Sequence, residues 1–241
     1  MLYDFDYPDT KYNPFHHPAG TPGSIGGQFA PADGRGGGGS RRATEDGIDA
    51  LVEVESSIQQ EKVTDKIKQG IAALPAKMRE RIASLRANRS DDTPPFVIAQ
   101  SLGPDQAGAY GVYFGHNDQI RFDQTTMTGL TQEHINRIVA HEVSHMLDNR
   151  YISDNSRSDA YFNKVSRKMK LTPAEKKYYN YFSSLAPEAW AEAGAQVITG
   201  GNFVNIYGPG ENLPNDVRPF TEAFKPAISF VRAQYKDAGL I

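Results

Sequence analysis

Two histidines and a glutamate at a fixed spacing are the residues of this chain most suited to chemistry. His141, Glu142 and His145 form the pattern H-E-x-x-H, inside a stretch whose apolar residues recur at helical intervals. One helical turn separates the two imidazoles, so both project from the same face. Zinc takes such a pair with one further protein ligand and an open position for water. Glu142 can take the proton of that water, so the pattern predicts a zinc site with Glu142 as general base.

The third metal ligand must come from another part of the chain. Asn149 stands one turn after His145 and is not a suitable ligand. Downstream, Glu188 and Glu192 lie four residues apart among small and aromatic residues, and two carboxylates on an apolar helix face need partners. One can bind the metal while the other accepts the free N–H of a ligating histidine. Either glutamate can take either role, and two solvent-exposed glutamates without any role are the alternative.

Composition narrows the kind of site and the kind of partner. The 241 residues include no cysteine, so a transition metal must be held by imidazole and carboxylate groups. The net charge of −3 gives no basic field for nucleic acid or for anionic lipid. The first fourteen residues are acidic and aromatic, and no stretch approaches about 18 consecutive apolar residues. We therefore expect neither an export signal nor a membrane segment, and no nucleic-acid partner.

The order of these residues resembles the catalytic domain of anthrax lethal factor and its metallopeptidase relatives. That family has an H-E-x-x-H helix, an Asp shortly after it and, some forty residues on, a Tyr followed by an E-x-x-x-E helix. The resemblance covers roughly residues 108–200, and the matching positions are His141, Glu142, His145, Asp148, Tyr181, Glu188 and Glu192. Ser144 departs from the Gly that many zincins have before the second histidine, and it is expected to crowd the approach to the metal.

The resemblance implies a role for each matched position. Glu188 is the third zinc ligand, and Glu192 supports a ligating histidine. Tyr181 steadies the oxyanion or protonates the leaving amine, although Tyr178 and Tyr179 are near enough in sequence to be alternatives. Asp148 either hydrogen-bonds near the site or only caps the helix that carries the histidines.

The N-terminal region is dense in glycine and proline, and we expect residues 1–42 to form a flexible arm. Its centre, from His16 to Pro31, resembles short Gly-rich motifs of phage head-morphogenesis proteins and related toxins. That resemblance implies docking to a phage or toxin partner, and a plain linker is the alternative.

Residues 43–241 are expected to form the folded domain, in three parts. Residues 43–90 are predicted to hold two helices, 43–70 and 75–87. Residues 91–130 are predicted to form the sheet, from a strand at 96–99 and a hairpin of 109–114 with 119–122. In residues 131–241, Thr131 should cap the metal-binding helix and His134 should lie at its surface. A loop at 152–158 and helices at 160–169, 187–199 and 217–236 should follow.

Together these features predict an α+β, zincin-like fold: a small, mostly antiparallel sheet over an active-site helix, with a C-terminal helical half that brings Glu188 to the metal. The expected function is hydrolysis of peptide bonds in a peptide or protein substrate, which would add to the sheet edge at 119–122. Two alternatives are a peptidoglycan-directed hydrolase of the same metal chemistry and a phage structural or adaptor protein that keeps the zincin scaffold without activity.

Overall fold

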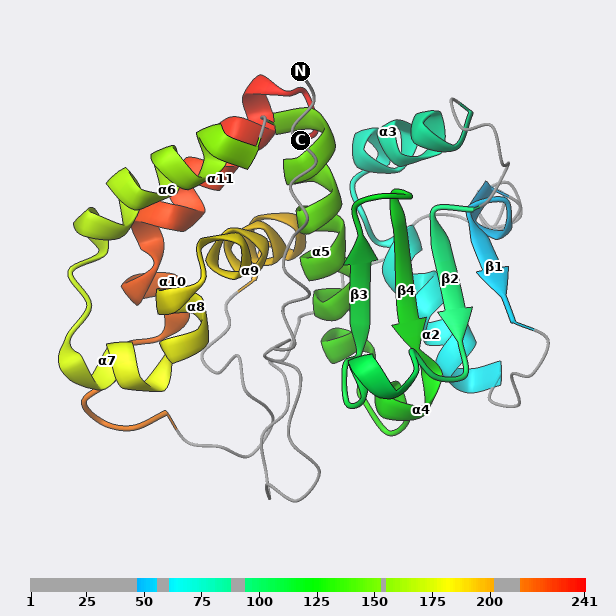
Figure 1. Ribbon diagram of the computed structural model, residues 1–241, viewed down its shortest axis with the longest axis horizontal. Coiled ribbons are helices and arrows are strands. Elements are labelled where there is room, and N and C mark those ends of the chain that lie inside the picture. The colour runs from blue at the N-terminus through cyan, green and yellow to red at the C-terminus, as the bar shows by residue number, and fades with distance from the viewer. Residues whose placement is uncertain (1–46, 56–60, 88–93, 153–154, 202–212) are drawn as a thin grey trace.

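The computed structural model describes residues 47–55, 61–87, 94–152, 155–201 and 213–241, without the side chains of 86–87 and 155–161. The N-terminal arm, 1–42, lies outside the described residues. The chain has an α+β fold in which the sheet and the larger group of helices lie on opposite sides of one long helix, α5 (Gln132–Leu147; Figure 1).

The sheet has four strands in the order β1-β2-β4-β3. The strands are β1 (Val52–Val54), β2 (Phe96–Ala99), β3 (Gly111–Phe114) and β4 (Gln119–Asp123). The β3–β4 hairpin is antiparallel, as predicted, with Val112 opposite Arg121. However, β1 pairs with β2 and β2 with β4 in parallel. The prediction of a mostly antiparallel sheet is therefore wrong, and the sheet is mixed.

The strand β1 explains that error. Leu51 and Val52 were assigned to a helix over 43–70, whereas the chain forms a short strand there and the helix α2 runs over Glu61–Ala72. Parallel strands need a crossover connection between them. Here α2 and α3 (Ala76–Ala87) occupy the connection from β1 to β2. Three residues are too few for an alternating pattern to stand out, so pairing with β2 decides their conformation.

The edge strand also differs from the prediction. The strand β4, which contains residues 119–122, lies inside the sheet between β2 and β3. The outer strand on the side of α5 is β3, and α5 packs against it (Figure 1). Any strand added next to α5 would therefore pair with β3.

The helix that carries His141 and His145, α5, spans Gln132–Leu147 and is buried along most of its length. Thr131 caps it as predicted, because its side chain accepts a hydrogen bond from the N–H of His134. The predicted apolar stripe is confirmed as buried: Ile135, Ile138, Val139, Val143, Met146 and Leu147. The helix α2 packs on α5 from one side and α9 from the other.

The helical half follows α5. A short π-helical turn over Asp148–Ile152 leads to α6 (Asn155–Met169), so the predicted loop at 152–158 is shorter than expected. The remaining helices are α7 (Pro173–Tyr178), α8 (Asn180–Ser184), α9 (Ala186–Thr199), α10 (Phe220–Ala223) and α11 (Lys225–Asp237). The last predicted helix, 217–236, is divided at Phe224 into α10 and α11, and Pro226 stands in the first turn of α11.

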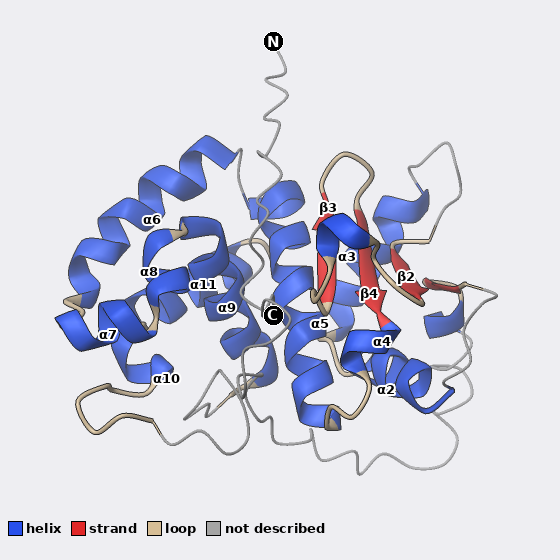
Figure 2. Ribbon diagram, turned by 60° about the horizontal axis from the view of Figure 1, so that its bottom comes forward, coloured by secondary structure: helices blue, strands red, loops and turns tan. Residues whose placement is uncertain are grey.

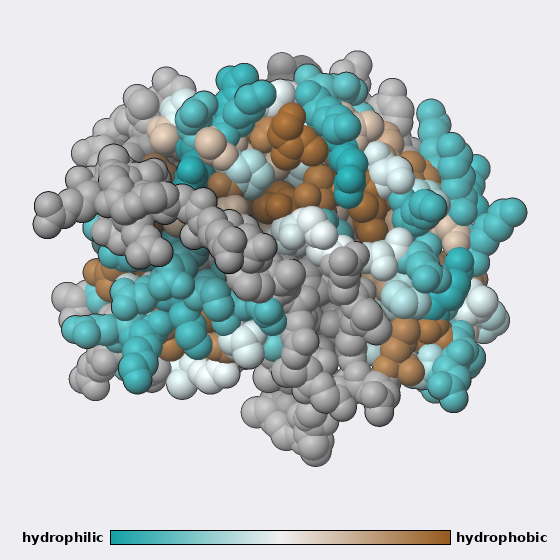
Figure 3. Space-filling model, turned by 180° about the vertical axis from the view of Figure 1, so that it is seen from behind, coloured by the Kyte–Doolittle hydropathy of each residue, from teal (hydrophilic) through white to brown (hydrophobic). Residues whose placement is uncertain are grey.

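In Figure 2 all four strands lie on one side of α5 and the helices of the second half on the other. The surface shown in Figure 3 carries both hydrophilic and hydrophobic side chains. Hydrophilic side chains line much of the rim of the face shown in Figure 3. Among the described residues, Val54 and Ile241 are the exposed large hydrophobic side chains. No helix in the described part of the chain is long and apolar enough to cross a membrane.

Candidate metal centre

Two helices, α5 and α9, supply the residues of the site, and their close crossing depends on small side chains. At Gly194 of α9, a β-carbon would overlap the hydroxyl oxygens of Ser144 and Tyr235 and would lie 2.8 Å from the β-carbon of Ser144. The Ser144 hydroxyl turns back to donate to the carbonyl of Ala140 at 2.7 Å. Gly194 thus makes room for Ser144, and α9 can lie directly against the face of α5 that carries the histidines.

The helix α9 directs its two glutamates toward the face of α5 that carries the histidines. Pro187 stands in its first turn, and Gly200 ends it in the left-handed conformation, with φ of 63°. Glu188 lies in the first turn, where the helix dipole favours a negative charge. Glu192 lies one turn further on, so both carboxylates face α5 at different heights.

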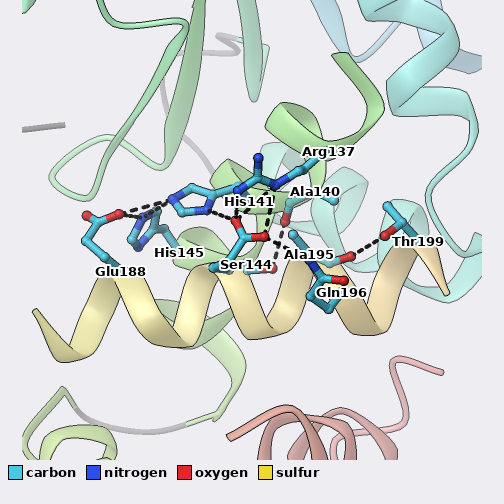
Figure 4. Close-up of polar contacts among 10 residues, drawn as sticks. Arg137, Ala140, His141, Ser144, His145, Glu188, Ala195, Gln196 and Thr199 are labelled. Atoms are coloured by element: carbon cyan, nitrogen blue, oxygen red, sulfur yellow. Dashed lines mark hydrogen bonds and ion pairs between the residues drawn. The ribbon is translucent and has the colours of Figure 1, made fainter. Parts of the chain in front are cut away.

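Three side chains converge at the first turn of α9. One oxygen of Glu188, Oε2, lies 3.1 Å from Nε2 of His141 and 3.4 Å from Nε2 of His145. The two Nε2 atoms are 3.2 Å apart. Figure 4 shows the three side chains pointing toward one another. Among the described residues, they form a group whose potential ligand atoms lie within 4.8 Å of one another and could hold a metal ion.

Glu142 lies beside the two histidines on α5 and is turned toward the sheet. Its carboxylate accepts a hydrogen bond from the backbone N–H of Tyr113 in β3. A β-carbon at Gly111 would lie 3.0 Å from Cγ of Glu142, so the absence of a side chain there lets Glu142 approach the strand. Burial raises the pKa of Glu142, against the opposing charges of His141 and His145. A raised pKa suits a carboxylate that must accept and release a proton near neutral pH.

Glu192 is held in a buried network between the two helices. Nε of Arg137 donates to Oε1 of Glu192 at 2.9 Å and to Oε2 at 3.1 Å. The side-chain amide of Gln196 donates to Oε1 at 3.0 Å, and Nδ1 of His141 lies 3.4 Å from Oε2. The side chains of Arg137 and Glu192 are 1% and 0% exposed. The carboxylate therefore sits behind His141, on the opposite side of the ring from Glu188.

The charges of this cluster favour a cation at its centre. Burial opposes the charge on His141, but the hydrogen bonds with Glu188 and Glu192 outweigh it and raise the pKa of His141 to about 9. Burial would likewise raise the pKa of Glu188, yet the two histidines bring it well below its usual range. For Glu192, the charge of Arg137 outweighs burial and lowers the pKa to about 2. Both glutamates therefore remain carboxylates, and the cluster attracts positive charge.

The predicted tyrosine lies in the helix before α9. Tyr181 belongs to α8 and packs its ring edge-on against Phe182, at 5.4 Å between centroids. Tyr179 is one of the alternatives, and its hydroxyl donates to the carbonyl of Arg218 at 2.7 Å. Its ring packs against Phe220 and Phe224, so Tyr179 serves the packing of the helical half. The role of Tyr181 in the reaction stays a prediction.

Asp148 and His134 lie near the two ends of α5. Asp148 is buried at the end of the helix, where its N–H donates to the carbonyls of Ser144 and His145. His134 is also buried, which contradicts its predicted surface position. Its Nδ1 lies 2.7 Å from the hydroxyl of Thr131, so this histidine takes part in the start of the helix.

Two residues at the site were not singled out from the sequence. Arg137 stands one turn before His141. A charged residue on a helix face that otherwise packs in the core needs a buried partner, and this was the sequence signal that could have identified it. Tyr113 carries no such signal, because its backbone N–H and not its side chain meets Glu142. Its hydroxyl donates to Asp118 at 2.9 Å and accepts from Asn149 at 2.7 Å, which fastens the hairpin to the end of α5.

Comparison with known proteins adds no further assignment. No protein-family model matches the chain, and a search of curated proteins gives no match.

Proposed function

We propose that this protein is a zinc-dependent endopeptidase, with His141, His145 and Glu188 as metal ligands and Glu142 as general base. The observation that carries the proposal is the triangle of ligand atoms, with sides of 3.1, 3.2 and 3.4 Å. Zinc bonds to imidazole nitrogen and carboxylate oxygen are about 2.0–2.1 Å long, so two ligands of a tetrahedral zinc stand about 3.3–3.4 Å apart. The triangle therefore has the size of one face of that tetrahedron.

The residues around the triangle suit hydrolysis of an amide. Zinc, when bound, supplies a Lewis acid that polarises a carbonyl and lowers the pKa of water. Glu142 then takes the proton of the attacking water and passes it to the leaving amine. The burial of Glu142 and its hydrogen bond with the Tyr113 N–H hold the carboxylate in one place between β3 and the histidines. Tyr181 is the proposed donor to the developing oxyanion.

The strand β3 is the proposed binding edge for the substrate. It is the outer strand beside α5, and the backbone N–H of Tyr113 points from its outer edge toward Glu142. Neighbouring residues of a strand direct their backbone groups to opposite edges, so Gly111 and Tyr113 share the outer one. We propose that an extended peptide pairs main chain to main chain with the groups of this edge other than the Tyr113 N–H, which Glu142 occupies, and runs past the ligand triangle. A protein substrate is thus favoured over a small molecule.

The proposal is tested by metal analysis followed by peptide cleavage. The full chain should hold one zinc ion, and His145→Ala should lose it. The zinc-loaded protein should cleave members of a peptide library. Treatment with a chelator should abolish cleavage, and added zinc should restore it. Stoichiometric zinc without cleavage would favour a structural or adaptor protein, and zinc retained by His145→Ala would remove the ligand assignment.

A further inference from the structure

Arg137, the buried partner of Glu192, has no part in the proposed reaction. Glu192 accepts hydrogen bonds from Arg137 and Gln196, and it lies 3.4 Å from His141. A guanidinium in the core costs desolvation energy unless its geometry is good, and replacing such a pair by apolar residues is often neutral or stabilising. Stability alone is therefore a weak reason for placing this pair here.

The geometry shows what Arg137 does to Glu192. Its Nε contacts both carboxylate oxygens, at 2.9 and 3.1 Å, and its Nη2 donates to Oε2 as well. A guanidinium that meets a carboxylate at two nitrogens fixes the plane of the carboxylate, which a single ammonium does not do. In Figure 4 Arg137 lies on the far side of His141 from Glu188. The order in space is thus Arg137, Glu192, His141 and then the ligand triangle.

We propose that Arg137 is a positioning residue of the metal centre, acting through Glu192 on the His141 ring. Arg137 sets the orientation of Glu192, Glu192 accepts the Nδ1–H of His141, and this leaves Nε2 as the lone-pair nitrogen directed at the metal. The inference rests on the proposed metal site. Partners of ligating histidines typically change metal affinity by about 10- to 100-fold, so a residue one step further out should change it by about tenfold.

A second arginine–glutamate pair provides a control in which the carboxylate is equally buried and the arginine side chain is 43% exposed. Arg218 donates to both oxygens of Glu175, which is also buried, but this pair joins α7 to the segment before α10. Glu175 further accepts from the backbone N–H of Thr172 at 2.8 Å, in the capping box of α7. Arg137→Lys and Arg218→Lys therefore make the same chemical change at a buried carboxylate, and only the first touches the residues behind His141.

The experiment measures the zinc dissociation constant of the full chain by competition with a chelator, and the visible spectrum of its Co²⁺ form. Arg137→Lys should weaken zinc binding by about tenfold and alter the cobalt spectrum. Arg218→Lys should keep the zinc dissociation constant within about twofold of the wild-type value and leave the cobalt spectrum unchanged. Wild-type protein that binds no zinc would defeat the proposed function and this inference together. The positioning role alone would be overturned if the wild type binds zinc and Arg137→Lys binds it equally tightly. It would also be overturned if Arg218→Lys loses as much zinc affinity as Arg137→Lys.

A variant that lacks the Glu192 carboxylate tests whether Arg137 acts through Glu192. In a Glu192→Gln background, Arg137→Met should produce no further change in zinc affinity, because the carboxylate that it orients is already lost. The double variant leaves no buried charge unpaired, so it also serves if Arg137→Lys or Glu192→Gln alone fails to fold. It is then compared with the wild type and should lose about 10- to 100-fold in zinc affinity, the loss expected for Glu192 by itself. A further loss in the double variant, relative to Glu192→Gln, would show that Arg137 acts by another route and would overturn the proposal.

Discussion

The two sides of α5 contribute to the candidate centre in different ways. On the side of α9, charged side chains meet the histidines: Glu188 at the ligand triangle, and Glu192 with Arg137 behind His141. On the side of the sheet, Glu142 meets a backbone N–H and a glycine of β3. One side thus offers groups that could hold a cation, and the other offers a strand that fixes the proposed base, Glu142. Changes on the two sides should therefore separate metal binding from turnover.

The largest effect is expected on the helical side, from Glu188→Ala. Loss of one of three protein ligands should abolish stoichiometric zinc binding, because two histidines alone do not complete the site. Glu80→Ala on the exposed face of α3 is the matched control and should bind zinc like the wild type. Metal analysis after gel filtration measures both. Full zinc occupancy in Glu188→Ala would place the third ligand elsewhere.

On the sheet side, Glu142→Ala should produce the opposite pattern. Zinc content and thermal melting should stay close to wild type, whereas peptide hydrolysis should fall by about 10²- to 10⁴-fold, the usual contribution of a general base. Single-turnover cleavage of a peptide substrate, with zinc measured on the same sample, gives both values. A variant that loses its zinc would show that Glu142 belongs to the metal-binding side.

A smaller change is expected for Glu192→Ala, again on the helical side. Without its acceptor behind Nδ1, His141 is a poorer ligand, and zinc affinity should fall by about 10- to 100-fold. Hydrolysis should then recover when zinc is added in excess. The competing assignment makes Glu192 the ligand and Glu188 its support. In that case Glu188→Ala would be the variant that added zinc rescues, so titrating both variants with zinc decides between the two.

The smallest effect should come from Gly111→Ala in β3. The added methyl group would lie 3.0 Å from Cγ of Glu142 and 3.1 Å from a ring carbon of Phe122, so one of them must move by a few tenths of an ångström. A shift of that size should lower turnover by about tenfold or less, with zinc binding retained. Gly47→Ala is the control, because a β-carbon there meets nothing within 4 Å. Equal rates for Gly111→Ala and wild type would mean that Glu142 tolerates the contact.

The two helices of the site, and the residues that they present, could be predicted from local sequence patterns. The helix α5 was predicted from its cap at Thr131 and from an apolar period of 3.6 residues. The helix α9 was predicted from Pro187 at its start and from Gly200 at its end. Within a helix, a spacing of four residues places side chains on one face whatever surrounds them. Local rules therefore sufficed to group His141 with His145, and Glu188 with Glu192.

How these groups meet depends on contacts between segments that are far apart in the sequence. Gly194 and Ser144 are fifty residues apart in sequence, and their contact sets which turn of α9 faces which histidine. The pairing of Arg137 with Glu192 and the meeting of Glu142 with Tyr113 are likewise contacts between separate elements. The same holds for β1, a three-residue strand that exists because β2 offers it a partner. Such contacts depend on packing between distant segments. The spacing of apolar residues and the capping residues of a single element carry no information about that packing.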